Sequence, residues 1–324
     1  MKALILIGAL AALVFIPLTT KANSTHTYQT VISPGDLAFT QLLGINSSGT
    51  IAGYFGDGTA VANNGFTLTL SPMPTFTPEN FPGSVQTQVI GINDLGNTVG
   101  FWIDASGAQH GFMDVAGTFT SVDNPLATPP LVTQLLGINN SNVTVGYYTD
   151  AAGNFHPFTY IGGTFTAINF SGEVSAQATG INNSGEIVGF NTSGAGTEGF
   201  LDNSGVFTFL QYPGATFTQA LGINDNGDIV GSYVDAMGNT HGFIYFIATG
   251  TYQTLNDPNA VGPGGTTVNG INDENQIVGF YSDADGNTDG FVGTPVGTAA
   301  PEPSSLLMLG AGVLALIAGK RILG

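Results

Sequence analysis

The sequence predicts an all-β fold, a six-bladed β-propeller of four-stranded blades. A phrase that recurs six times and a composition rich in turn-forming residues lead to this prediction. The phrase begins with Gly-Ile-Asn, and its copies start at residues 44, 91, 137, 180, 222 and 270. These starts lie 42 to 48 residues apart, a period typical of propeller blades and other repeat arrays. The 48 Gly residues fit many short strands joined by tight turns.

Each copy is expected to contain four strands. Three residues after the Asn of the phrase stands Gly or Asn, the residue types that adopt positive φ at low cost, so we expect a turn between the first two strands there. In four copies an Asp-x-x-Gly turn then joins a second strand, such as 229–234, to a third, such as 241–246. A third turn leads to a fourth strand, such as 164–169. Four short strands fit a propeller blade, whereas a parallel β-solenoid, the main rival, would not need two hairpins per repeat.

The two ends of the repeat array favour a closed ring. The sixth copy stops after its third strand, at 289–292, and supplies no fourth one. Residues 27–34 (TYQTVISP), ahead of the first copy, closely match residues 251–258 (TYQTLNDP), a fourth strand in the fifth copy. We therefore predict that the N-terminal strand completes the last blade, which closes the ring and leaves no large unpaired sheet edge.

The charge distribution narrows the range of partners. Residues 23–300 hold 21 acidic residues, all 22 of the chain except Glu302, and no Lys or Arg. Nucleic acid is therefore not expected as a partner, because phosphate binding relies on basic side chains. The chain has no Cys, so neither disulfides nor Cys-ligated metals are possible.

The N-terminus has the three parts of a secretory signal peptide. Lys2 gives the positive start, residues 3–16 form an apolar run, and Ala22 ends a suitable cleavage site. We expect residues 1–22 to be a signal peptide and residues 23–297 to be the six-repeat propeller domain.

Residues 298–324 form a second terminal segment. A Pro-Glu-Pro tripeptide precedes an apolar run over 304–319 and a Lys-Arg pair. An ordinary tail anchor would explain the apolar run but not the tripeptide. The segment resembles the PEP-CTERM sorting signal of Gram-negative bacteria, which an exosortase recognises and processes. The resemblance assigns the sorting motif to Pro301, Glu302, Pro303, Lys320 and Arg321.

That resemblance also implies a route for the protein. It implies an exosortase-type sorting enzyme as partner and a transmembrane helix that anchors the exported protein transiently in the inner membrane. The destination is the cell surface or the extracellular matrix. Together with the N-terminal signal, the expectation is therefore a propeller flanked by terminal signal and anchor helices.

The repeats themselves resemble the bacterial extracellular HAF-repeat family, named for a His-Ala-Phe triplet. The resemblance covers about residues 27–293, and the Gly-Ile-Asn and Ile-Val-Gly phrases carry it. The triplet itself departs from the family pattern, because its central residue is Gly or Pro after His110, His156 and His241. At the position of the His, the other three copies have Asn64, Glu198 and Asp289. The family has no established activity that could be carried over to any residue.

A candidate binding ring lies three residues before the Gly of each phrase. If the first strand is innermost, these side chains surround a central channel, where a polar ring could bind water, an ion or a neutral ligand. Hydrogen bonds between neighbouring blades explain such amides as well, and we favour that structural role. The ring consists of Gln41, Gln88, Gln134, Gln177, Gln219 and Thr267.

Metal binding has two candidate sets. The residues at the triplet position are possible ligands by type, but each belongs to a different blade, so we expect each to be a local hydrogen-bonding partner instead. Asp283 and Asp285 stand in a fragment that looks like part of a calcium loop without the closing Glu of an EF-hand. Capping of the turn explains the same residues. Calcium is the one cofactor candidate.

We therefore expect a non-catalytic, surface-sorted binding or scaffolding module of the cell envelope or extracellular matrix, with exopolysaccharide or other envelope components as candidate partners. The alternative is an enzyme that acts on extracellular polysaccharide through Asp36, Asp123 or Asp257. Glycosidases need two carboxyl groups that flank one bond. Two such carboxyl groups within ~5–10 Å in a pocket would favour the enzyme.

Overall fold

The computed structural model describes residues 25–169 and 175–297. The predicted signal peptide (1–22) and the predicted sorting segment (298–324) lie outside the described residues, as do the terminal helices expected there. The described residues form strands and loops without a helix, so the part of the chain that the structure covers includes no helix capable of crossing a membrane.

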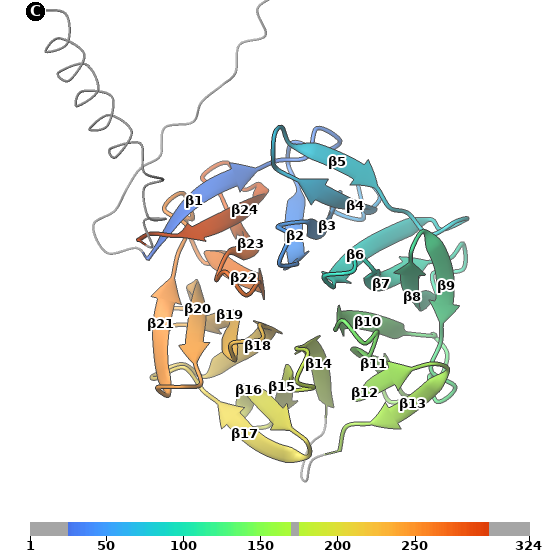
Figure 1. Cartoon of the computed structure of the whole chain (residues 1–324). Helices are drawn as coiled ribbons and strands as arrows, with labels where there is room; N and C mark the ends of the chain where they lie inside the picture. Colours follow the sequence, from blue (N-terminus) through green and yellow to red (C-terminus); the bar gives the residue numbers. More distant parts are fainter. Residues whose placement is uncertain (1–24, 170–174, 298–324) are drawn as a thin grey trace, which may run out of the picture.

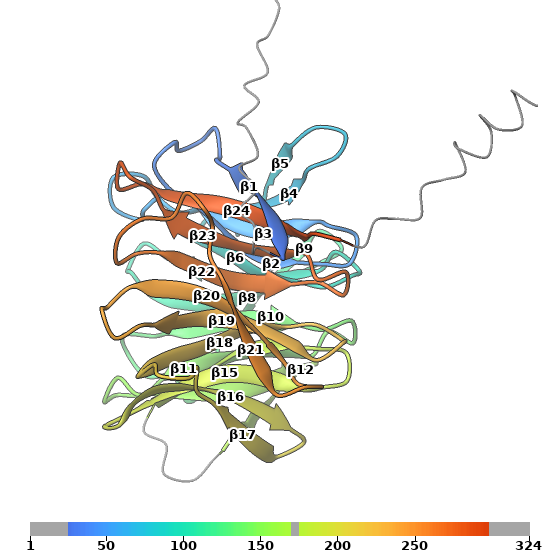
Figure 2. The same cartoon turned by 90° about the vertical axis from the view of Figure 1, so that its left-hand side faces the viewer.

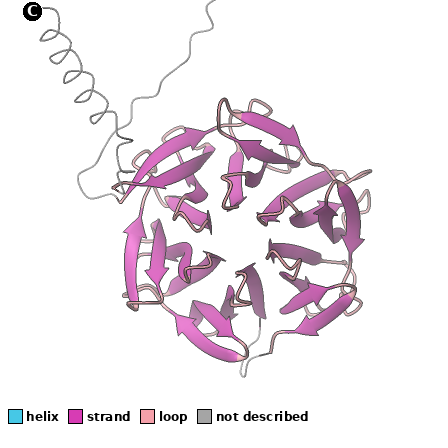
Figure 3. Ribbon diagram, in the orientation of Figure 1, coloured by secondary structure: helices cyan, strands magenta, loops and turns pink. Residues whose placement is uncertain are grey.

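The strands form a ring of four-stranded units around a central channel (Figures 1 and 3). Unit 1 contains β2 (Thr40–Ile45), β3 (Ile51–Phe55), β4 (Asn64–Thr69) and β5 (Thr75–Pro78). Unit 2 contains β6 (Gln86–Ile92), β7 (Thr98–Ile103), β8 (Gln109–Val115) and β9 (Thr118–Val122). Unit 3 contains β10 (Thr133–Ile138), β11 (Thr144–Thr149), β12 (Phe155–Ile161) and β13 (Thr164–Ala167).

The second half of the ring follows the same plan. Unit 4 contains β14 (Ser175–Ile181), β15 (Ile187–Ser193), β16 (Gly196–Asn203) and β17 (Val206–Leu210). Unit 5 contains β18 (Phe217–Ile223), β19 (Asp228–Val234), β20 (Thr240–Phe246) and β21 (Thr251–Leu255). Unit 6 contains β22 (Thr266–Ile271), β23 (Ile277–Ser282), β24 (Thr288–Pro295) and β1 (His26–Val31).

Neighbouring strands within each unit are antiparallel, and the first strand of the repeat is innermost (Figure 1). Units 4 and 5 are joined into one eight-stranded sheet by a single parallel pair, Thr197 with Phe217. The predicted propeller arrangement of four-stranded blades is confirmed. Most predicted strands agree with the observed ones within a residue or two, although β24 extends further at its end than expected.

The predicted closure by the N-terminal strand is confirmed. β1 pairs antiparallel with β24, and Val31 lies opposite Gly290. Both views of the fold show the two strands side by side (Figures 1 and 2). The side chain of Val31 is buried with Leu42 and Phe66 of unit 1, so β1 also fills the core between the last unit and the first.

The repeated phrase forms the turn that was expected between the first two strands. Gly49 and Asn142 have positive φ values of 77° and 57°. The Asn of the phrase stabilises this turn, because the Oδ1 atom of Asn139 accepts hydrogen bonds from the backbone N–H groups of Ser141 at 3.0 Å and Val143 at 3.1 Å. The same pattern positions a polar side chain at the inner end of every blade.

The Gly of the phrase allows the inner strands to approach one another closely. A Cβ atom at Gly44 would lie 2.7 Å from the carbonyl oxygen of Ile90 in the next unit, which is closer than side chains tolerate. The hydrophobic core lies farther out, between adjacent sheets. Its largest side chains are fully buried and come from the third strand of each repeat: Phe66, Phe112, Phe158, Phe200, Phe243 and Phe291.

Candidate functional site: the central channel and its polar rings

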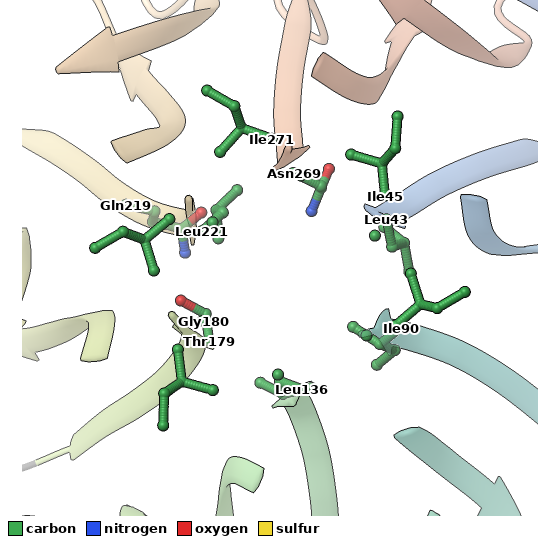
Figure 4. A pocket seen from close by; sticks show the side chains of 18 of the residues that line it. Leu43, Ile45, Ile90, Leu136, Thr179, Gly180, Gln219, Leu221, Asn269 and Ile271 are labelled. Carbon is green, nitrogen blue, oxygen red and sulfur yellow. The ribbon is translucent and has the colours of Figure 1, made fainter. Parts of the chain in front are cut away.

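The central channel is a cavity of about 410 Å³ surrounded by the innermost strands (Figure 4). No side chain that lines it is charged. Immediately before each Gly of the repeated phrase, one side chain reaches the cavity. Four of these six are aliphatic and two are polar: Leu43, Ile90, Leu136, Thr179, Leu221 and Asn269.

The two polar members of this set differ in their hydrogen bonding. The Thr179 hydroxyl lies 2.9 Å from the carbonyl oxygen of Ala220 and 3.2 Å from that of Val188, so its donor is used within the protein. The Oδ1 atom of Asn269 is buried and accepts no hydrogen bond from the described part of the chain. A buried acceptor without a partner is uncommon, because its desolvation is uncompensated. Asn269 is therefore the position where the channel departs most from its repeat.

The structure places only part of the predicted ring on the channel. Gln41, Gln177, Gln219 and Thr267 line the cavity, whereas Gln88 and Gln134 are absent from its lining. The Nε2 atom of Gln88 donates to Asn63 Oδ1 at 2.8 Å, and that of Gln134 donates to Gln109 Oε1 at 2.6 Å.

Both acceptors belong to the preceding blade, so these two amides have the favoured structural role. In unit 1, Tyr54 donates its hydroxyl proton to Gln41 Oε1 at 2.9 Å. Ligand binding by the remaining members stays a prediction.

A continuous ring of Asn side chains surrounds one end of the channel. The Nδ2 atom of each Asn in the repeated phrase donates to the backbone carbonyl of the equivalent Asn in the next unit, at 2.9 to 3.2 Å. The cycle closes because Asn272 donates to Asn46. The sequence indicated the turn-capping role of these residues but not this link between blades. The sequence feature that could have indicated the link is the presence of Asn at this position in all six copies: Asn46, Asn93, Asn139, Asn182, Asn224 and Asn272.

The next residue along the chain adds a second polar ring. In units 2 to 6 its carboxylate or amide oxygen accepts the backbone N–H of the equivalent residue in the preceding unit, as Asp94 Oδ1 does from Ser47 at 2.8 Å. In unit 1 the Ser47 hydroxyl instead donates to Asp273 Oδ2 at 3.3 Å. Burial would raise the pKa of Asp94, but hydrogen bonds from Asn140 and Ser47 outweigh it and lower the pKa overall. This ring lines a cavity of about 70 Å³ at the mouth of the channel and consists of Ser47, Asp94, Asn140, Asn183, Asp225 and Asp273.

The three His residues of the triplet bond to Asp residues of their own unit. The Nε2 atom of His156 lies 2.9 Å from Asp150 Oδ2, and that of His241 lies 3.0 Å from Asp235 Oδ2. His110 Nδ1 lies 3.0 Å from Asp123 Oδ1. Their expected role as local hydrogen-bonding partners agrees with this geometry. The described residues contain no group of three His, Asp or Glu side chains suited to one metal ion.

The calcium candidates lie in a turn of the same kind. Asp283 Oδ1 accepts backbone hydrogen bonds from Asp285 at 2.9 Å and Asn287 at 2.8 Å, while Asp283 Oδ2 accepts the Asn287 amide at 3.0 Å. Asp235 makes the equivalent bonds in a sister turn, where Met237 stands in the place of Asp285. The carboxylate of Asp283 thus caps its turn, and calcium binding stays a prediction.

The three candidate catalytic acids lie in different surroundings. Asp36 Oδ1 accepts the backbone N–H of Ala38 at 2.9 Å, and Asp123 bonds to His110. Asp257 is 2 % exposed, and burial, with the charge of Asp289, raises its pKa to about 6. Asp289 is itself only 6 % exposed. Neither Asp257 nor Asp289 lines the channel or its mouth cavity.

Comparisons with known proteins support the predicted sorting motif at the C-terminus and the predicted fold. Residues 299–322 match the PEP-CTERM protein-sorting motif. The motif implies recognition by an exosortase, export, and sorting to the cell surface in Gram-negative bacteria. No curated protein matches the chain.

Solved structures with the same architecture have little sequence in common with this chain. A protein assigned as TolB from Agrobacterium tumefaciens is 12 % identical, with a TM-score of 0.58 over 81 % of this chain and 92 % of that one. TolB from Acinetobacter baumannii is 11 % identical, with a TM-score of 0.49 over 81 % of this chain but only 65 % of its own. A lectin from Aleuria aurantia is 11 % identical, with a TM-score of 0.48 over 82 % of this chain and 98 % of that one. At 12 % identity, the likeness to the Agrobacterium protein shows the fold alone.

Proposed function

We propose that this protein is a non-catalytic, six-bladed β-propeller that acts at the cell surface or in the extracellular matrix as a binding or scaffolding module. The observation that carries the proposal is the closed Asn ring from Asn46 to Asn272, because it joins the inner ends of all six units into one disc. A disc that is closed both by this ring and by the β1–β24 pair is suited to holding a binding surface in fixed geometry.

The finer route to the surface is part of the same proposal. The signal peptide at 1–22 starts export, the apolar run after Pro303 anchors the protein transiently in the inner membrane, and an exosortase then processes the tail. The resemblance of the repeats to the extracellular HAF-repeat family supports an extracellular destination. With 21 acidic residues and no Lys or Arg in residues 23–300, the domains repel one another and stay soluble.

The burial of Asp257, one of the three candidate acids, argues against the enzyme alternative. The charge of Asp289 acts on Asp257, but the two residues are only 6 % and 2 % exposed, respectively. A glycosidase must place its two carboxyl groups on either side of a bound sugar bond, and a chain of sugars does not reach groups buried to this extent. Exopolysaccharide is therefore proposed as a ligand rather than as a substrate.

Retention of the purified domain on extracellular matrix material from the host tests the proposed binding role. Residues 23–297 contain every strand of the closed ring, so they can be prepared as a soluble domain. We expect this domain to be retained by exopolysaccharide and envelope fractions from the host, without release of sugar fragments. A heat-unfolded sample of the same domain is the control. Release of reducing ends would support the enzyme instead, and absence of retention would reject the binding role.

A further inference from the structure

The channel is polar on one side and apolar on the other, although the repeats that build it are similar. Leu43, Ile90 and Leu136 of units 1 to 3 lie along one side of the opening (Figure 4). Thr179 and Asn269 of units 4 and 6 lie across from them, with the aliphatic Leu221 of unit 5 between them. The repeat alone would have produced six equivalent walls.

The ring positions of units 2 to 6 follow the same division, whereas Gln41 of unit 1 lines the cavity on the aliphatic side and accepts the Tyr54 hydroxyl. In units 2 and 3, Gln88 and Gln134 are turned away from the cavity by their bonds to the preceding blade. In units 4 to 6, Gln177, Gln219 and Thr267 line the cavity and make no side-chain hydrogen bond to the described part of the chain. Their donors and acceptors are therefore not used within the described part of the chain and are available to a ligand in the cavity.

The chemistry of the lining restricts the ligand. A charged ligand would lose its hydration without gaining a counter-charge, because no lining residue is charged. A pure hydrocarbon would leave the polar side chains around Asn269 without partners. The fitting molecule is neutral, carries hydroxyl or amide groups along one edge, and has an apolar face for the aliphatic side.

Size leads to the same class of molecule. The cavity of about 410 Å³ lies at the small end of the range for ligand pockets, which is ~300–1,000 Å³. A short saccharide is small enough, presents hydroxyl groups at its edges and has C–H faces on its rings. Phe190 and Phe280, which also line the cavity, add ring surface for such faces.

We propose that the central channel binds a short neutral saccharide, with Asn269, Gln219 and Thr267 as its hydrogen-bonding partners and Leu43, Ile90 and Leu136 as its apolar contacts. This inference rests on the proposed binding function and names the ligand class. The side-chain nitrogen of Asn269 points toward the opening, whereas its buried Oδ1 atom points away from it (Figure 4), so the Asn269 amide donates to a ligand hydroxyl or carbonyl oxygen.

The probes for the test are N-acetylglucosamine, its β-1,4-linked dimer, and glucosamine, which has the same ring but a positive charge. Binding to the soluble domain is measured by calorimetry and by ligand-observed NMR. We expect both neutral sugars to bind below about 10 mM and glucosamine to bind at least about tenfold more weakly. If the two neutral sugars do not bind, or if glucosamine binds equally well, the proposal is wrong.

Two variants locate the site. Asn269→Leu introduces the residue type that units 1, 3 and 5 have at this position, so the fold should tolerate it. It should weaken sugar binding about tenfold, the loss expected for one or two hydrogen bonds. Gln219→Leu should weaken binding by a similar factor, while Gln29→Leu on the exposed outer strand is the matched control and should bind like the wild type. Unchanged binding in both channel variants would overturn the proposal.

The sugar-binding test and the matrix-retention test can fail independently of each other. Retention on the matrix without binding of the neutral sugars would reject the channel site and leave the proposed binding function intact. Sugar binding that is lost in Asn269→Leu, without retention of the wild type on the matrix, would support the channel site and reject the proposed function.

Discussion

The side-chain amide of Asn272 donates to the backbone carbonyl of Asn46, 226 residues earlier in the chain, at 3.2 Å. The same amide contacts Gln276 Oε1 at 3.0 Å, and its Oδ1 accepts the backbone N–H of Gln276 at 2.9 Å. One side chain therefore caps its own turn and joins the last unit to the first. The ring of blades is closed at its inner edge by this bond and at its outer edge by the pairing of β1 with β24.

Substitution of Asn272 should weaken the whole ring. Asn272→Ala removes the bond to Asn46 and leaves buried backbone groups of the turn unpaired, so we expect unfolding to require roughly 2–3 kcal/mol less free energy. Asn226→Ala is the control, because the Asn226 amide makes one exposed bond to the carbonyl of Asp273. Urea denaturation of the two variants measures the difference. Equal losses would mean that the inner ring adds nothing to closure.

Removal of the N-terminal strand should be more damaging. A variant that begins at Leu37 loses β1, which exposes the edge of β24 and opens the core where Val31 contacts Leu42 and Phe66. We expect a lower Tm, a broader transition and binding of a dye that recognises exposed apolar surface. A variant that begins at Asn23 keeps the strand and serves as the reference. Identical melting of the two would show that the ring does not need this strand.

Much of the fold could be predicted from local patterns. The match between residues 27–34 and 251–258 predicted the closing strand, and the Gly or Asn after each phrase predicted the turns. The links between blades could not be predicted, because only the curvature of the ring brings Asn46 next to Asn93, 47 residues later. The capping role of these Asn residues was visible in the sequence, while their second partner depended on tertiary structure.

The same limit applies to the channel. The position of the Gln ring followed from the order of the strands, and four of its six members line the cavity. Gln88 and Gln134 turn away because Asn63 and Gln109 of the preceding blade offer acceptors, a choice that the spacing of the repeat does not encode. Asn269 was not singled out from the sequence, although the Leu, Ile or Thr of the other copies made it an exception.

The stability of the domain should decrease as pH rises toward 8. Burial raises the pKa of Glu79 to about 7, against the hydrogen bond from Thr98 and with the added effect of the Asp114 charge. Because the folded state then holds a proton that the unfolded state releases near its ordinary pKa of 4.5, stability is lost as pH rises from about 4.5 to about 7. Asp257, with a pKa of about 6, contributes in the same direction.

Glu79→Gln should flatten this pH dependence. We expect the free energy of unfolding of the wild type to fall by roughly 1–2 kcal/mol between pH 5 and pH 8, and that of the variant to fall by less. Glu274→Gln removes the same charge from an exposed position, so it controls for general repulsion among the acids. Urea denaturation at four pH values compares the three proteins. Parallel curves for Glu79→Gln and Glu274→Gln would disprove the role of Glu79.

A comparison of the Tm in calcium and in magnesium distinguishes a specific calcium site from general screening of the acidic surface. If Asp283 and Asp285 bind calcium, micromolar calcium should raise the Tm where an equal concentration of magnesium does not. Asp285→Asn should abolish the difference between the two ions, because it removes one of the two proposed calcium-binding carboxylates. The turn itself should persist, since the backbone hydrogen bonds to Asp283 do not require the Asp285 carboxylate. Identical responses of the wild type to both ions would leave only screening, and the two residues would be turn residues.

The sorting motif predicts where the mature protein ends. The match at residues 299–322 includes Pro301, Glu302 and Pro303, and the apolar run that follows them resembles a membrane anchor with a basic stop at Lys320 and Arg321. Processing by an exosortase should release the propeller from this segment, so mass spectrometry of protein from the host should find a C-terminus near residue 300. Glu302→Ala should leave the intact chain in the inner-membrane fraction, while Gln29→Ala on the outer strand should be processed normally. Intact wild-type protein that ends at Gly324 and stays in the inner membrane of a host with an exosortase would contradict the sorting role, because an anchor alone needs no Pro-Glu-Pro motif.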